Sequence, residues 1–305
     1  MIKPDDCTLA PETYKKVRQE AERILNEADA FGVFPTPVDE IMSAAKVHEV
    51  KEDVLNEGFL TKIRKGVTGT LRKALSKVLG IFDARDRLVF IDRSLKSVKK
   101  AFVKLHETAH GFLMWQRDLY ALVEDGENNI DPDIADQFDR EANVFASEVL
   151  FQCDGFINEA NDHDFGIFVP VRISKHYGGS IYASVRQYVS KNHRACAVII
   201  LNPPVIDINV GFKAYVRRAP VTSPAFKNVF GELKLPEYFT PDDKIGKMVP
   251  INNRRASGKR SLPIIDSNGK EHECICEAFT NTYQVFILIQ HIKPITSTTL
   301  LVVNG

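Results

Sequence analysis

The 305-residue sequence has no excess of either charge, because 40 lysines and arginines balance 40 aspartates and glutamates. A balanced chain exerts no long-range attraction on nucleic acid or on an anionic membrane, so any such binding has to be local. Cysteine is scarce as well, and five scattered cysteines do not make a disulfide framework. We therefore expect reduced thiols and a cytoplasmic protein.

The sequence also lacks an apolar run long enough to cross a membrane. Its most apolar stretches, residues 195–201 and 285–289, are far shorter than the roughly 20 residues that a spanning helix needs. Residues 1–16 are polar and do not contain the apolar core of a secretory signal. What remains is a composition of 44% apolar and 26% charged residues, which is typical of a water-soluble globular protein with more than one small domain.

Apolar residues at helical spacing dominate the first half of the chain. They predict helices over residues 14–31, 38–45, 94 to beyond 115, and 134–151. Two β-prone runs, residues 78–82 and 87–91, flank a polar turn at residues 83–86 and predict a β-hairpin. A polar, acidic loop is expected at residues 124–133, between the last two helices.

The second half changes character at Ala195, where alternation of apolar and polar residues with a period of two predicts a β-rich module. Just before it, two short helices hinged at Gly178-Gly179 resemble a helix-turn-helix. We favour a packing hairpin over DNA docking, because such helix pairs are common packing units. The second helix also offers only Arg186 and Gln187 as base-reading side chains.

These patterns predict an α+β protein in three parts. The expected parts are residues 1–165 as the main α+β domain, residues 166–194 as the helical, helix-turn-helix-like extension, and residues 195–305 as the β-rich domain. A sensory or partner-binding role is the expectation for the β-rich domain.

The segment His106-Glu107-Thr108-Ala109-His110 is the strongest chemical signal in the sequence. Two histidines four residues apart on a helix lie on one face about one turn apart, so both imidazoles can reach one metal ion. A carboxylate beside the first histidine can then take a proton from a water molecule whose pKa zinc has lowered to about 7. The segment predicts His106 and His110 as metal ligands and Glu107 as the general base.

A catalytic zinc site needs a third protein ligand and keeps one position open for water. Glu141 is the best candidate, because it lies in the predicted helix at residues 134–151, among apolar residues that can anchor that helix beside the first. The acidic residues at 124–133 lie in a loop, where a carboxylate is poorly preorganised. We therefore expect zinc at His106, His110 and Glu141, and manganese also suits these ligands. The alternative without a metal site is a helix with solvated histidines, or a metal-free pseudoenzyme.

The segments AFVKLHETAHGFL and DREANVFASEVL together resemble the ImmA/IrrE family of metallopeptidases. Members of that family pair an HExxH helix with a downstream helix of the pattern E-A-N-x-F-A. The upstream segment Pro37-Val38-Asp39 fits the family layout too, and the resemblance covers approximately residues 14–190. It implies a zincin-like fold and a role in cleaving helix-turn-helix repressors during stress or phage-type regulation.

By position, the resemblance implies zinc bound by His106, His110 and Glu141. Two departures from the family pattern stand out. Residues 150–153, Leu-Phe-Gln-Cys, replace the frequent Leu-Met-Pro ending, and Ala109 stands where many members have glycine. Neither change removes a ligand, but the first bears on substrate binding.

Three further features have functional and structural interpretations. His176 and Tyr177, beside the glycine hinge, are candidates to line the cleft and stabilise an oxyanion. The pattern His272-x-Cys274-x-Cys276 offers soft ligands on one strand face, but a fourth ligand is not evident and buried cysteines often act as small hydrophobes. Residues 254–260 are basic and favour a solvated loop over a phosphate site, because no aromatic residue is interleaved.

The function expected from the sequence is that of a zinc-dependent endopeptidase that cuts a regulatory protein such as a helix-turn-helix repressor. The alternative is a DNA-binding or partner-binding regulator with a metal site and no turnover. In that alternative, residues 172–190 are the element that would contact nucleic acid.

Overall fold

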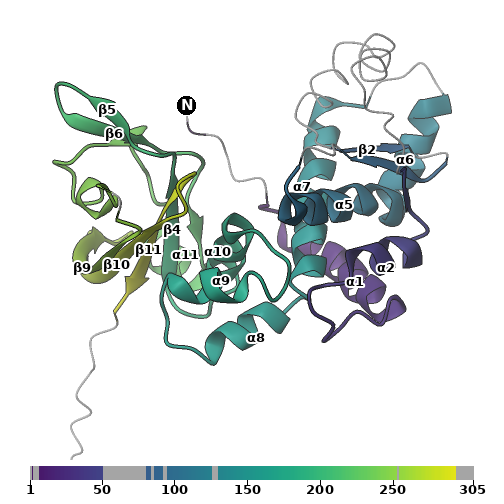
Figure 1. Ribbon diagram of the computed structural model, residues 1–305, viewed down its shortest axis with the longest axis horizontal. Coiled ribbons are helices and arrows are strands. Elements are labelled where there is room, and N and C mark those ends of the chain that lie inside the picture. The colour runs from purple at the N-terminus through teal and green to yellow at the C-terminus, as the bar shows by residue number, and fades with distance from the viewer. Residues whose placement is uncertain are drawn as a thin grey trace, which may run out of the picture. The chain divides into compact units, whose positions relative to one another are not determined.

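The computed structural model describes residues 2, 7–50, 80–83, 86–91, 95–125, 130–252 and 254–292. The chain forms two compact units, one of Pro4–Tyr188 and the other of Val189–Gly305 with Met1–Lys3. Both units combine helices with sheets, which confirms the expected α+β composition (Figure 1).

The first unit is mainly helical and contains a small sheet. Its elements are α1 (Pro11–Glu27), α2 (Val38–Ala44), β1 (His48–Glu49), β2 (Gly80–Asp83), β3 (Leu88–Ile91), α5 (Ser97–Phe112), α6 (Met114–Asp125), α7 (Pro132–Leu150), α8 (Gly155–Asn161), α9 (Phe168–Ile173) and α10 (Ile181–Ser190). The strand order is β1-β3-β2, with β1 parallel and β2 antiparallel to β3. The expected hairpin is thus present, although residues 78 and 79 lie outside the described part of the chain.

Helix α7 lies at the centre of this unit, because both α1 and α5 pack against it (Figure 1). Asp131 is the N-cap residue of α7, and its side chain accepts a hydrogen bond from the backbone N–H of Asp133. A proline follows at the first helical position. Its buried face comprises Phe138, Glu141, Ala142, Val144, Phe145, Ala146, Glu148, Val149 and Leu150. Two carboxylates on a buried face require partners, so this helix carries polar contacts as well as the core.

The expected long helix from residue 94 to beyond residue 115 is instead two helices. Helix α5 ends at Phe112, and the backbone of Leu113 is extended, with a ψ angle of 103°, before α6 begins at Met114. The end of α5 packs closely on the sheet: a Cβ atom added to Gly111 would come within 2.7 Å of the Phe82 ring. Leu113 itself is completely buried. Tertiary packing therefore redirects the chain where the apolar periodicity would continue a helix.

The second unit is rich in β-strands, as the alternation from Ala195 predicts. Its elements are β4 (Cys196–Leu201), β5 (Val205–Asp207), β6 (Gly211–Tyr215), β7 (Val221–Thr222), α11 (Pro224–Phe230), β8 (Tyr238–Phe239), the 3-10 helix η1 (Gly246–Met248), β9 (Ala256–Ile265), β10 (Glu271–Thr280) and β11 (Val285–His291). A five-stranded antiparallel sheet has the order β7-β4-β11-β10-β9, and a three-stranded sheet has the order β5-β6-β8.

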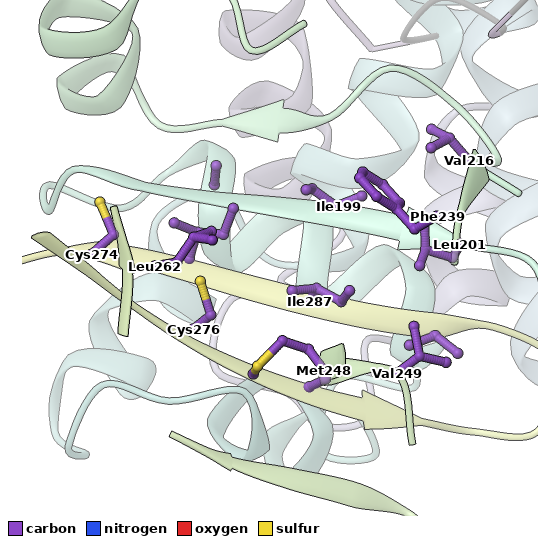
Figure 2. Packing of buried hydrophobic residues seen from close by; sticks show 14 of the residues in the cluster. Ile199, Leu201, Val216, Phe239, Met248, Val249, Leu262, Cys274, Cys276 and Ile287 are labelled. Atoms are coloured by element: carbon purple, nitrogen blue, oxygen red, sulfur yellow. The ribbon is translucent and has the colours of Figure 1, made fainter. Parts of the chain in front are cut away.

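The core of the second unit forms on one face of the five-stranded sheet. Ile199 and Leu201 of β4, with Ile287 of β11, are completely buried there. Cys274 and Cys276 of β10 lie among the same apolar side chains (Figure 2). They behave as small hydrophobes, and burial raises the pKa of both thiols.

Two expectations for this unit need correction or qualification. The expectation of a loop at residues 254–260 is wrong from Ala256 onward, because Ala256 begins β9, which pairs with β10 on both sides of a shift in register at residues 258–259. The imidazole of His272 lies 2.8 Å from Asp266 rather than beside a metal position shared with the two cysteines.

No disulfide joins any of the five cysteines. In the described parts of the chain, no helix combines the length and the apolar character needed to cross a bilayer.

The division into units predicts that the first unit folds alone. All candidate metal-binding residues and the helices that carry them belong to Pro4–Tyr188. We expect a protein that lacks residues 196–305 to unfold cooperatively on heating, followed by circular dichroism, and to bind zinc as tightly as the full chain. A truncated protein that is insoluble or binds no metal would show that the two units depend on each other for folding.

Candidate metal centre

Helix α5 brings the two histidines of the HExxH segment together. Four residues separate His106 from His110, and their Nε2 atoms lie 3.3 Å apart. The two rings are nearly perpendicular, with centroids 5.0 Å apart. Both imidazoles therefore point the same ring nitrogen at one small volume beside the helix.

This spacing fits a metal ion. Two ligands about 2.0–2.1 Å from zinc at a tetrahedral angle are separated by about 3.3–3.4 Å. The distance of 3.3 Å between the Nε2 atoms of His106 and His110 matches that separation. Without a cation or a shared proton, two nitrogen lone pairs at this distance repel each other. The donor set thus fits the metal that the sequence predicts.

Two amide side chains hold the imidazoles in the orientation that a metal requires. The Nδ1 atom of His106 lies 3.0 Å from Oδ1 of Asn143, and Nδ1 of His110 lies 2.7 Å from Oε1 of Gln116. An amide oxygen only accepts hydrogen bonds, so each Nδ1 carries the hydrogen and each Nε2 keeps its lone pair. Second-shell partners of this kind fix the tautomer and the ring orientation of metal-binding histidines.

Glu107 lies beside the histidine pair in a setting suited to proton transfer. Its side chain is buried, and its Oε1 atom has no hydrogen-bond partner among the described residues. Burial raises the pKa of Glu107 to about 7, an effect that His106 opposes and Asp139 reinforces. A carboxylate with a pKa near neutrality both accepts and releases protons readily.

The carboxylates of α7 are placed differently from the sequence expectation. Glu141, the expected third ligand, is 2% exposed and accepts hydrogen bonds from Trp115, Gln116 and Gln137. Asp139 instead has its Oδ1 atom 3.4 Å from Nε2 of His106. The structure therefore brings Asp139 next to the histidine pair and connects Glu141 to other partners.

The site is not a closed shell of ligands. In the residues that the structure describes, no three side chains of histidine, cysteine, aspartate or glutamate surround one point at metal-binding distances. What is preformed is the pair of Nε2 atoms with its two orienting amides.

Tyr120 is a site residue that sequence reasoning missed. Its ring packs edge-on against His110, with centroids 5.4 Å apart, and against Phe138 at 5.9 Å. Burial and the carboxylates of Glu107 and Asp139 raise its pKa. Tyr120 lies four residues after Gln116 on α6, a spacing that becomes informative only once the break at Leu113 is known.

His176 and Tyr177, the expected oxyanion donors, lie in another part of this unit. His176 contacts the carboxylate of Glu159 at 2.9 Å, and its ring centroid lies 3.9 Å from that of Phe34. His176 and Tyr177, together with Arg18 and Asp154, line an open pocket. None of the HExxH residues lines this pocket. The geometry gives Tyr120, not His176 or Tyr177, access to the histidine pair.

The base-reading side chains expected in the helical extension are also placed unfavourably for DNA binding. Arg186 and Gln187 of α10 are only 7% and 6% exposed. Buried side chains do not reach base edges in a groove. Neither of these two side chains is therefore available to read a base sequence in this structure.

Comparison with known proteins identifies the segment that carries this site. Residues 70–185 match the Peptidase M78 family, described as the IrrE N-terminal-like domain. No curated protein matches the chain. One similar solved structure is a Mycobacterium tuberculosis transcriptional regulator, at 15% identity and a TM-score of 0.49, with 90% of this chain and 76% of that chain covered. A likeness of that level carries no argument about function.

The matched segment contains both parts of the candidate metal centre, the HExxH helix α5 and the carboxylate-bearing helix α7. These are the two helices whose motifs indicate the ImmA/IrrE resemblance in the sequence. The match over residues 70–185 agrees with that resemblance, and this segment of the chain is similar to the IrrE N-terminal-like domain of the M78 peptidase family.

Proposed function

We propose that this protein is a zinc-dependent endopeptidase with a zincin-like catalytic unit. The observation that carries the proposal is the pair of Nε2 atoms of His106 and His110, 3.3 Å apart on one helix, beside the buried carboxylate of Glu107. Each part of this arrangement has a use in peptide hydrolysis, and the similarity of residues 70–185 to a peptidase family supports the same activity.

Each side chain has a defined task in the proposed reaction. His106 and His110 hold the metal, and Asn143 and Gln116 keep their rings oriented. When bound, zinc would act as a Lewis acid and would lower the pKa of the water molecule that it binds to about 7. Glu107 accepts the proton of the attacking water at its Oε1 atom and passes it to the leaving amine.

The proposed substrate is another protein, such as a helix-turn-helix repressor, cut in an exposed loop. Support comes from the ImmA/IrrE resemblance, which concerns regulatory proteolysis. Zinc is the proposed metal, and manganese suits the same ligands.

A selective protease of this kind should be a poor general protease. We expect unfolded casein to be cut slowly, because productive binding would require a specific folded partner to align its loop with the histidine pair. Rapid casein degradation without sequence preference, followed by fluorescence of a labelled substrate, would exclude the proposed substrate class.

Replacing Glu107 with glutamine tests the proposed general base. The amide still donates and accepts hydrogen bonds but cannot take the proton of water, so we expect zinc content to stay unchanged and the hydrolysis rate to fall by about 10² to 10⁴. The matched control is Asp118→Asn on α6, whose carboxylate is 58% exposed and interacts with Arg117. Full activity in Glu107→Gln would reassign the base. Stable partner binding with no turnover even in the natural chain would favour the non-catalytic regulator.

Tyr120 is the proposed hydrogen-bond donor to the developing oxyanion, because its ring packs directly on His110. Removing one such donor typically costs about 10² to 10³ in kcat. We expect Tyr120→Phe to show this loss in kcat, with KM and zinc content nearly unchanged. Tyr283→Phe, at an exposed position in the second unit, is the control. An unchanged kcat in Tyr120→Phe would assign the role to another donor.

A further inference from the structure

The first unit contains an open pocket that the proposed reaction does not use. The pocket has a volume of about 730 Å³, and residues of α1, of the loop after α1, of segment 152–162 and of the turn at His176 and Tyr177 line it. Pockets that bind ligands have volumes of about 300–1,000 Å³. This pocket, called the α1–α8 pocket below, is therefore large enough to receive a ligand.

The α1–α8 pocket is negatively charged. Its lining has one guanidinium group, that of Arg18, and four carboxylates, those of Glu22, Asp154, Glu159 and Asp162. Arg18 is already paired, because Asp154 accepts two hydrogen bonds from it, at 2.9 and 2.7 Å, and Glu22 accepts one at 2.9 Å. Glu159 and Asp162 are the carboxylates that remain for a ligand. Because a concave surface of one charge sign attracts the opposite charge, that ligand is a cation.

Glu159 and Asp162 lie at the end of α8 where negative charge is unfavourable. Asp162 is the C-cap residue of this helix, and Glu159 lies three positions earlier. Side chains three apart on a helix are neighbours, so two carboxylates there repel each other, and the partial negative charge at a helix C-terminus adds to the repulsion. His176 has its Nδ1 atom 2.9 Å from Oε2 of Glu159, but one imidazole does not balance two carboxylates. A bound cation would relieve this repulsion.

Aromatic rings stand beside these carboxylates. The ring centroid of Phe34 lies 3.9 Å from that of His176 and 4.9 Å from that of Tyr177. Phe34 is nevertheless 37% exposed, and Phe31, in the same loop, is 44% exposed. The face of an aromatic ring attracts a cation that lies within about 6 Å of its centre. Exposed rings next to carboxylates therefore favour the same class of ligand as the charge does.

Gln152 holds the aromatic loop in place. Its side chain accepts a hydrogen bond from the backbone N–H of Gly32 and donates one to the carbonyl oxygen of Val33, both at 2.8 Å. Gln152 is 4% exposed, and its backbone has a φ angle of 49°. The proline of a Leu-Met-Pro ending would be restricted to a φ angle near −65° and has no side-chain amide. The departure from the family pattern at residues 150–153 thus shapes one wall of the pocket.

We propose that the α1–α8 pocket binds an arginine side chain of a partner protein. A guanidinium group is planar, stacks on aromatic rings and pairs with carboxylates through several N–H donors, as Arg18 already does with Asp154. The exposed rings favour a protein as the source of the cation, because aromatic residues and arginine are enriched at protein interfaces. The inference does not depend on metal binding at His106 and His110.

The proposal is tested by titrating the ¹⁵N-labelled full chain with blocked pentapeptides, followed by NMR. Each peptide has alanines around a central arginine, lysine or citrulline, the last being an uncharged isostere of arginine. We expect the arginine peptide to shift the amide signals of Gly32 and Gly155, which line the pocket. The lysine peptide should bind several-fold more weakly, because an ammonium group neither stacks nor pairs through a planar fork. The citrulline peptide should leave both signals unchanged.

Two variants connect the binding to the proposed side chains. Replacing Glu159 with glutamine and Asp162 with asparagine together removes both charges, and we expect the arginine peptide to bind at least about 10-fold more weakly. Asp164→Asn, at an exposed position outside the pocket, is the matched control and should bind as the natural protein does. Phe34→Leu should weaken binding by about 2- to 5-fold, because it removes a ring face. The double variant keeps the test valid if Phe34→Leu does not fold.

Three results would overturn the arginine site: no shift at Gly32 and Gly155 with the arginine peptide, equal binding of the arginine peptide and either of the other two, or unchanged binding in the double variant. Tighter binding of spermidine than of the arginine peptide would overturn the protein partner and assign the pocket to a small polyamine.

Discussion

The arrangement of the site depends on one contact, the approach of the two Nε2 atoms of His106 and His110 to 3.3 Å. A helix supplies the spacing, because residues four apart lie one above the other on the same face. The spacing alone does not turn both lone pairs inward. That requires a hydrogen-bond acceptor behind each ring, and Asn143 and Gln116 supply it from two different helices. The geometry of the candidate metal centre therefore depends on three packed helices rather than on the HExxH segment alone.

The break at Leu113 is what brings the third helix into place. If α5 continued straight, Gln116 and Tyr120 would extend away along the same axis instead of returning to His110. Gly111, two residues before the break, lies so close to the small sheet that an added Cβ atom would come within 2.7 Å of the Phe82 ring. The direction of α6 after Leu113 determines where the orienting amide and the tyrosine of the site lie.

The sequence predicts the two motif helices well, because each has apolar residues at helical spacing around its polar motif. It does not predict the break at Leu113, since Phe112, Leu113 and Trp115 continue the apolar pattern and tertiary packing decides the outcome. Nor does the periodicity select between Asp139 and Glu141. The apolar residues beside Glu141 that favour it as an anchored ligand also bury it, and its hydrogen bonds to Trp115 and Gln116 depend on a helix whose direction the sequence does not give. The periodicity does not predict strand β9 either, because its polar side chains stay exposed and only the backbone pairing with β10 makes the segment a strand.

The most direct test of this account is the position of the metal itself. Diffraction data collected at the zinc absorption edge from crystals of the zinc-loaded protein would locate the ion independently of any assumption about its ligands. The account predicts an anomalous peak about 2.0–2.1 Å from the Nε2 atoms of His106 and His110. No peak between the two imidazoles, or a peak elsewhere in the protein, would contradict it.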